Sequence, residues 1–218
     1  FKDYDDIRNS PKQTWTAVQP GDIKYKDING DGIIDDSDQV AIGATKRPNL
    51  IYGIGTSIAW KGFDVNLHFQ GSGKSTFCID GKTVRAFSEG DWGNILTDLI
   101  NDRWVDSETA ATLGIQANEN PNASYPRLSY GENSNNFRNS TFWMRNGRYF
   151  RLKNVDVGYT LPKSFVNKLH LSNIRIFMTG TNLLTWSSFK LWDPEMGSTN
   201  GEQYPLTKSV TMGLTVNL

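Results

Sequence analysis

The sequence predicts an all-β fold, a set of antiparallel strands of the kind that form the wall of a transmembrane β-barrel. After Pro48, apolar and polar residues alternate with a period of two over several segments, which is the pattern of strands with two unlike faces. The links between these segments are short and long in turn, an asymmetry typical of outer-membrane barrels with long extracellular loops. No apolar run reaches the roughly 18 residues that a membrane-spanning helix needs.

Composition excludes several other classes of protein. The 218 residues hold 23 Lys and Arg against 23 Asp and Glu, so no basic surface favours nucleic acid, and we expect no nucleic-acid partner. Aromatic residues make up 12% of the chain, which argues against disorder. Cys78 is the single cysteine, which excludes an intrachain disulfide framework and a multi-cysteine metal cluster.

The chain opens with an irregular segment that a hairpin follows. Residues 1–48 are polar and rich in turn signals, and they are predicted to be an extracellular loop segment with a calcium-type loop. Residues 50–60 and 63–70 alternate on the two sides of the dipeptide Lys61-Gly62. That dipeptide suits a two-residue turn, so the sequence predicts a β-hairpin here.

Three further strands complete the predicted barrel segment, residues 49–218. They are expected at residues 148–160, 173–184 and 210–218. Long loops are expected at residues 71–143 and 185–207, and a loop of this length usually has a function of its own. In the strand at 148–160, Phe150 and Leu152 have the opposite parity to Val155 and Val157. We therefore expect a β-bulge between these two pairs.

Five strands are too few for a closed transmembrane barrel, because the smallest such barrels have about eight. An open edge in hydrocarbon would leave backbone groups without hydrogen bonds. Either the barrel interpretation is wrong or the chain is one piece of a larger barrel, and we expect the second. Trp60, Phe63 and Tyr159 fall beside the short links, where an aromatic girdle belongs.

Several sequence blocks follow one another in a characteristic order. They are KDINGDG at 26–32, YG at 52–53, KGFD at 61–64, YFRLKNV at 149–155, GYTLP at 158–162, TNLLTW at 181–186 and DPE at 193–195. Together these blocks resemble the C-terminal portion of SusC/RagA-type TonB-dependent outer-membrane transporters of Bacteroidota. The similarity covers nearly the whole chain and is weakest at residues 71–143. The last residue, Leu218, departs from the family, whose final strand commonly ends in Phe.

The resemblance implies a function in transport rather than catalysis. It implies that these are the final strands of a roughly 22-stranded barrel in the outer membrane. Outer-membrane lipid would surround that barrel. It implies uptake of glycans or other oligomers, driven by the TonB complex through segments that lie upstream of these residues. A SusD-like surface lipoprotein would be the partner that covers the barrel.

An acidic loop at residues 27–38 fits the template of a calcium-binding loop. Ca²⁺ takes about six to eight oxygen ligands, which alternate acidic side chains supply, and Gly32 permits the sharp turn. The expected ligands are the side chains of Asp27, Asn29, Asp31 and Asp38 and the carbonyl of Ile33. Asp38 replaces the usual Glu and so binds more weakly. An Asx-rich turn without an ion is the simpler alternative; otherwise Ca²⁺ is expected to stabilise the loop.

Two tryptophans are candidates for contact with cargo or a partner protein. Trp186 and Trp192 lie in or beside the second long loop, where exposed rings can stack on sugars or receive a protein. Packing within the loop is the equally weighted alternative. GSGKST at 71–76 lacks the first glycine of a phosphate loop, because His68 stands at that position, and we expect no nucleotide site.

Two other functions stay open on the residues alone. One is a secreted, calcium-stabilised β-sandwich domain that binds carbohydrate, and the other is an enzyme built on such a sandwich. No spacing of carboxylates or histidines indicates a catalytic site, so we expect no enzyme. The apolar faces discriminate these folds, because Ile58, Val65, Ile176 and Leu214 would be exposed on a barrel and buried in a sandwich.

Overall fold

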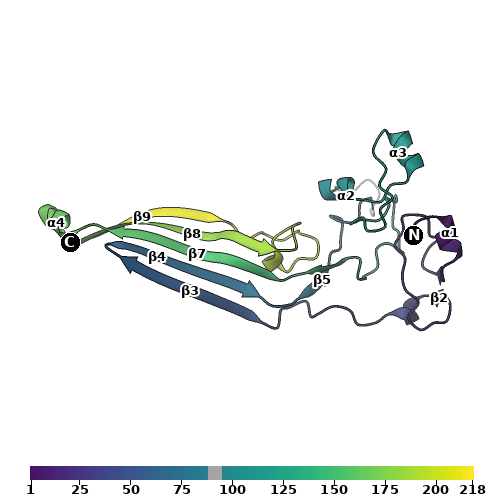
Figure 1. The fold of residues 1–218 in the computed structure, drawn as a ribbon, viewed down its shortest axis with the longest axis horizontal. Coiled ribbons are helices and arrows are strands. Elements are labelled where there is room, and N and C mark those ends of the chain that lie inside the picture. Colours follow the sequence, from purple (N-terminus) through teal and green to yellow (C-terminus); the bar gives the residue numbers. More distant parts are fainter. Residues whose placement is uncertain (88–94) are drawn as a thin grey trace. The chain divides into compact units, whose positions relative to one another are not determined.

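The structure, a computed structural model, describes residues 1–87 and 95–218 (Figure 1). The chain forms two compact units. Unit 1 comprises Phe1–Gly43 and Cys78–Met144, and unit 2 comprises Ala44–Phe77 and Arg145–Leu218. Among the described residues, no helix combines the length and the apolar character needed to cross a membrane.

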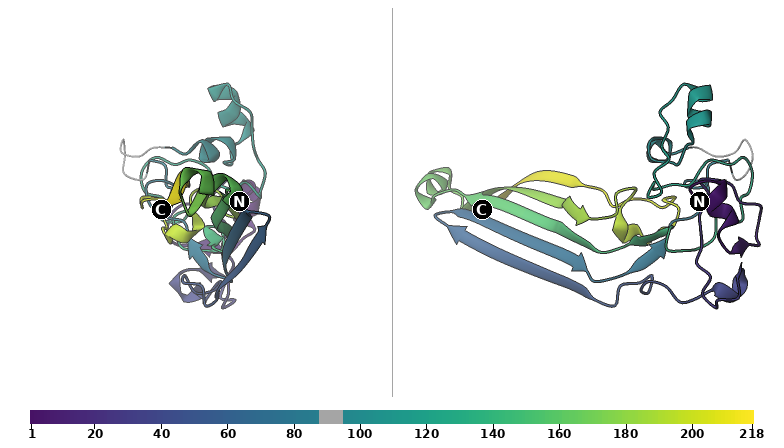
Figure 2. Two further views of the ribbon diagram at one scale, coloured as in Figure 1. Left: turned by 90° about the vertical axis from the view of Figure 1, so that its left-hand side faces the viewer. Right: turned by 45° about the vertical axis from the view of Figure 1, so that its right-hand side comes forward.

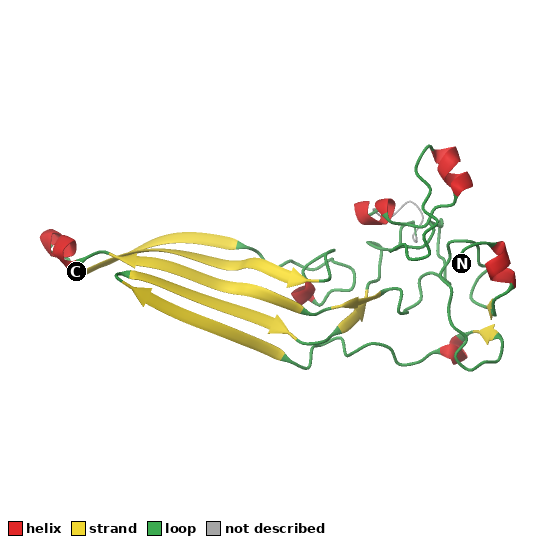
Figure 3. Cartoon of the chain, viewed as in Figure 1, coloured by secondary structure: helices red, strands yellow, loops and turns green. Residues whose placement is uncertain are grey.

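Unit 2 is built on a five-stranded antiparallel sheet with the strand order β3-β4-β7-β8-β9. Its strands are β3 (Ile51–Trp60), β4 (Phe63–Ser72), β7 (Tyr149–Thr160), β8 (Asn173–Ser187) and β9 (Ser209–Asn217). The right-hand view in Figure 2 shows them side by side, and Figure 3 shows that strands dominate this unit. All five strands predicted from the alternation are present, and the expected all-β fold is confirmed. Strands β3 and β9 each have one neighbour in the sheet.

The hairpin between β3 and β4 turns in two residues, as predicted. Trp60 pairs with Phe63, and both turn residues have positive φ, 48° at Lys61 and 91° at Gly62. Positive φ at both positions matches the right-handed twist of the flanking strands, and glycine adopts it without strain. A β-carbon at Gly62 would also lie 2.8 Å from the carbonyl oxygen of Thr160.

The short links of the sheet share one end. The link between β7 and β8 holds α4 (Lys163–Val166) and the 3₁₀ turn η2 (Asn167–Leu169), and it lies at the same end of the sheet as the β3–β4 turn (Figure 1). The long connections leave from the other end. This arrangement confirms the up-and-down order that the loop lengths predict.

The expected β-bulge lies in the middle of the sheet. The register between β4 and β7 shifts between His68 and Phe69, and that between β7 and β8 shifts between Leu152 and Asn154. Lys153 is the extra residue relative to β4. Relative to β7, the extra residue lies in β8, where Asn182 and Leu183 lie opposite Lys153. Because one added residue reverses the side to which the following side chains point, the bulge brings both halves of β7 into one apolar face.

The sheet has one apolar and one polar face. The apolar face includes Ile54, Ile58, Val65, Leu67, Val157, Ile176, Met178, Val210, Met212 and Leu214. The polar face includes Asp64, Asn66, His68, Gln70, Asn154, Asp156, Arg175, Thr179, Thr211 and Thr215. On the apolar face Ile58 is 60% exposed, Leu214 62% and Met212 76%. A β-sandwich would bury these side chains against a second sheet, so the exposure disfavours that alternative.

Unit 1 is an assembly of short elements and loops. It contains α1 (Tyr4–Arg8), β1 (Lys12–Gln13), β2 (Ile33–Ile34), η1 (Asp36–Asp38), α2 (Thr97–Asn101) and α3 (Ser107–Leu113). Strands β5 (Thr76–Cys78) and β6 (Met144–Asn146) pair with each other where the chain passes from one unit to the other.

A buried polar network connects the two segments of unit 1. The Asn136 side-chain amide donates to Asp22 at 2.8 Å, and Arg127 pairs with the same carboxylate at 2.7 Å. The amide of Gln13 donates to the Asn135 side chain. These bonds link residues 78–144 to residues 1–43 within unit 1.

Candidate functional site

Two rows of aromatic rings bound the apolar face of the sheet. Beside the short links, the Phe63 and Tyr159 rings lie 4.4 Å apart, with Trp60 opposite Phe63. At the other end Phe150 is the centre of a second row, which extends over β3, β4, β7 and β8. Its ring lies 6.3 Å from that of Tyr52, 5.3 Å from that of Phe69 and 5.8 Å from that of Trp186. Aromatic girdles flank the apolar band of outer-membrane barrels in this way.

The structure separates the two candidate tryptophans. Trp186 lies in β8 on the apolar face, half exposed, in the second aromatic row. Trp192 lies in the loop between β8 and β9, where its indole N–H donates to the Ser198 carbonyl at 3.1 Å. The Phe189 ring packs edge-on at 4.9 Å from it. A contact of either residue with cargo or a partner stays a prediction.

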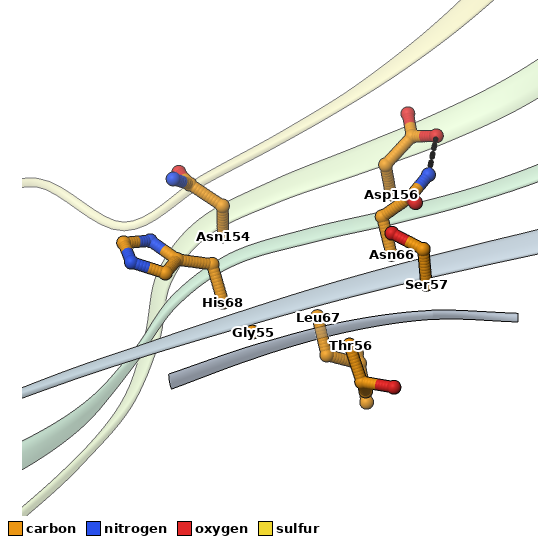
Figure 4. Close-up of a pocket in the computed structure, with 8 residues that line it drawn as sticks. All are labelled: Gly55, Thr56, Ser57, Asn66, Leu67, His68, Asn154 and Asp156. Atoms are coloured by element: carbon orange, nitrogen blue, oxygen red, sulfur yellow. Dashed lines mark hydrogen bonds between the residues drawn. The ribbon is translucent and has the colours of Figure 1, made fainter. Parts of the chain in front are cut away.

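The polar face contains a hollow of about 300 Å³ over β3, β4 and β7 (Figure 4). It lies above Gly55, which has no side chain to fill it. His68 and Asn154 point into the same region (Figure 4), and neither side chain makes a hydrogen bond within the described residues. The amide of Asn66 donates to Asp156 at 3.3 Å on the other side of the hollow. The alternation places these residues on one face, but it gives no sign of the hollow.

An ion-pair cluster lies on the polar face next to this hollow. Arg175 of β8 donates from two nitrogens to the carboxylate of Asp64 on β4, and also to Asp156 on β7. The guanidinium stacks on the ring of Phe177, 5.0 Å from its centre. The cluster links three strands on the side of the sheet that is unsuited to hydrocarbon, because charged groups there stay hydrated or paired.

The acidic loop of unit 1 is closed by its own carboxylates. Asp27 accepts the backbone N–H groups of Gly30 and Gly32 at 2.6 and 2.9 Å. Asp38 accepts those of Ile28 at 2.7 Å and Asp35 at 3.0 Å. These N–H groups stabilise the charged carboxylate and so hold the pKa of Asp38 below its usual range, and the N–H of Asp35 has the largest effect.

The loop thus has the turn chemistry of the calcium template, and Gly32 has the expected positive φ of 83°. Within the described residues, however, no three His, Cys, Asp or Glu side chains lie close enough together to hold an ion. Of the expected ligands Asp27, Asn29, Asp31, Ile33 and Asp38, the side chains of Asn29 and Asp31 bond each other at 2.9 Å. The calcium site stays a prediction.

Curated relatives match the chain over most of its length. TonB-dependent receptor P26 of Formosa agariphila is 30% identical over 210 residues, which are 90% of this chain and 19% of that protein. TonB-dependent receptor P3 of the same organism is 30% identical over 222 residues, 94% of this chain and 20% of that protein. The chain belongs to the TonB-dependent receptor family. It spans about a fifth of the length of these relatives.

Solved structures agree with this assignment at the level of the fold. The RagAB peptide transporter gives a TM-score of 0.62 at 22% identity, over 91% of this chain and 20% of that one. The RagAB peptide importer in its open-open state gives 0.61 at 23% identity, over 86% and 19%. No family model matches the chain. The resemblance to SusC/RagA-type receptors that the sequence blocks indicate is confirmed.

Proposed function

We propose that the protein is a TonB-dependent outer-membrane importer of oligomeric nutrients, and that the sheet of unit 2 forms part of the wall of its barrel, roughly 22 strands in all. The relatives carry receptor names, which favours a transport role over an enzymatic one. The observation that carries the proposal is the two-faced sheet, whose apolar face stays exposed between two aromatic rows.

The two faces support opposite environments. The apolar face suits the acyl chains of outer-membrane lipid, with the aromatic rows at the two interfaces. The polar face, with the hollow and the Arg175 ion pairs, suits the water-filled interior. The short links would then face the periplasm, and the loops at 71–143 and 185–207 the cell exterior.

Partners and cargo belong to this proposal. A SusD-like lipoprotein would cover the extracellular mouth, and the TonB complex would act through parts of the receptor other than these residues. Glycans and peptides are both candidate cargoes: the chain resembles receptors whose names give no substrate, and RagAB is named as a peptide transporter. Ca²⁺ in the 27–38 loop would have a structural role.

Growth on defined oligomers tests the function. A strain without the receptor gene should lose growth on one class of oligosaccharide or peptide and keep growth on the corresponding monomer. A strain without TonB should lose the same growth. Recovery of the protein in the soluble fraction without detergent would contradict the proposal, as would unchanged growth on every oligomer tested.

A further inference from the structure

The least exposed large side chain of the polar face belongs to an arginine. Arg151 of β7 is 1% exposed. One of its terminal nitrogens donates to both carboxylate oxygens of Asp193, at 2.6 and 2.8 Å. Its Nε lies 3.6 Å from Glu195. A guanidinium removed from water in this way is stable only while its counter-charges stay in place.

The two carboxylates belong to one turn in the loop between β8 and β9. Asp193 caps the 3₁₀ turn η3 (Pro194–Met196), because its side chain also accepts the Glu195 N–H at 2.9 Å. Glu195 in turn receives the ammonium of Lys153 at 3.3 Å. The turn is therefore attached to β7 at two adjacent points.

The spacing of the two cations along β7 makes this double attachment possible. In a strand, residues two apart share a face, so Arg151 and Lys153 both lie on the polar side, while Leu152 between them lies on the apolar face. The bulge then adds Asn154 to the polar side and restores the apolar face from Val155 onward.

The cluster is a contact within the chain rather than a site for an ion. Its two cations, Arg151 and Lys153, balance its two carboxylates, Asp193 and Glu195, so no net charge remains to attract a ligand. All four groups are at most about a quarter exposed.

The rest of the loop packs on itself and follows the turn. The indole N–H of Trp192 bonds the Ser198 carbonyl at 3.1 Å, and the Ser198 hydroxyl accepts the Gly201 N–H at 2.9 Å. Ser198 is 3% exposed. Residues 189–201 therefore have few independent ways to move once the turn is attached.

We propose that Arg151 is a positioning residue, which attaches the 193–196 turn to the polar face and so makes the 189–201 loop a fixed part of the cargo path instead of a mobile lid. Only the statement that the loop is part of the cargo path rests on the proposed function. The attachment itself is a property of unit 2.

Hydrogen exchange on the receptor, purified in detergent with its full chain, tests the attachment. Arg151→Met should speed amide exchange in peptides that cover residues 194–201 by at least about tenfold, because the buried pair limits local opening. Arg151→Lys keeps the charge and loses the planar fork, so its exchange should be intermediate. Arg148→Met is the matched control, since Arg148 is exposed and its side chain makes no ion pair within the described residues; it should leave exchange unchanged.

Equal exchange in Arg151→Met and Arg148→Met would overturn the proposal. If Arg151→Met fails to assemble, Asp193→Asn provides the second test, and unchanged exchange in that variant overturns the proposal equally. If instead the proposed import function is wrong, the growth assay will show it, while the difference in amide exchange between Arg151→Met and Arg148→Met will remain.

Discussion

At the scale of single residues, the turn at Lys61-Gly62 constrains the sheet through both backbone conformation and space. Gly62→Ala should lower the free energy of unfolding by about 1–2 kcal/mol or more, because it forces an L residue to positive φ and also meets the Thr160 carbonyl. Gly114→Ala is the control: φ is 66° there, and a β-carbon would have nothing within 4 Å. Denaturant unfolding in detergent should give the larger loss for Gly62→Ala. Equal losses would show that the close contact is absent.

The acidic loop makes a second prediction at this scale. Addition of Ca²⁺ after chelation should stabilise the protein, by about 2.7 kcal/mol at a concentration 100 times the Kd. Asp31→Asn should abolish the stabilisation. Asp36→Asn should retain it, although the charge change is the same, because Asp36 bonds Trp15 instead of facing the loop centre. Since the backbone N–H groups of Asp35 and Ile28 hold the pKa of Asp38 below its usual 3.8, protonation of Asp38 should weaken Ca²⁺ binding only below about that pH.

Thermal unfolding with and without Ca²⁺ measures this effect. No shift with any variant would leave the loop as an Asx-rich turn that folds without metal. That simpler alternative already accounts for the hydrogen bonds of Asp27 and Asp38.

Residue chemistry alone did not separate Trp186 from Trp192. Both lie in or beside the same long loop. The difference lies in register, since Trp186 pairs with Phe150 across the strands and so joins the apolar face. Nor did sequence indicate the partners of Arg151, because 42 residues separate it from Asp193.

At the scale of elements, parity along β7 was sufficient to predict the bulge. The apolar residues before and after Lys153 follow different parities, and an apolar face needs all of them on one side. The five strands and the tight turn followed from the same alternation. The sequence of unit 1 shows no such alternation. A network of buried side-chain amides holds this unit together. Such contacts have no local sequence signature, so the sequence did not predict them.

Deletion of Lys153 tests the role of the bulge. Without it, Phe150 and Leu152 would point to the polar face, or the strand would slip by one residue. Outer-membrane assembly of the receptor, followed by the change in gel mobility on heating, should be lost. Lys153→Ala keeps the residue count and should assemble, with only the Glu195 ion pair removed. Normal assembly of the deletion variant would mean that another residue supplies the bulge.

At the scale of the whole molecule, neighbouring residues of β8 should respond in opposite ways to a charge. Met178 lies on the apolar face between the aromatic rows, and Thr179 lies on the polar face opposite Asp156. Met178→Arg should destabilise the protein in lipid by about 2–4 kcal/mol, as expected for a cation in the middle of a bilayer. Thr179→Arg should cost little. Unfolding from lipid vesicles gives both values, and equal costs would contradict the membrane-facing assignment.

The two edge strands, β3 and β9, determine how this sheet could insert into a membrane. Each has a margin of amide and carbonyl groups that no other strand of the sheet satisfies, and in hydrocarbon each such group costs several kcal/mol. An isolated five-stranded sheet should therefore not insert into a bilayer, and it should aggregate through pairing of its edge strands. If the sheet is part of a barrel wall, it should insert into the membrane only after neighbouring strands have paired with both β3 and β9. Strand pairing at these two edges, more than the apolar face, would then control when this region enters lipid.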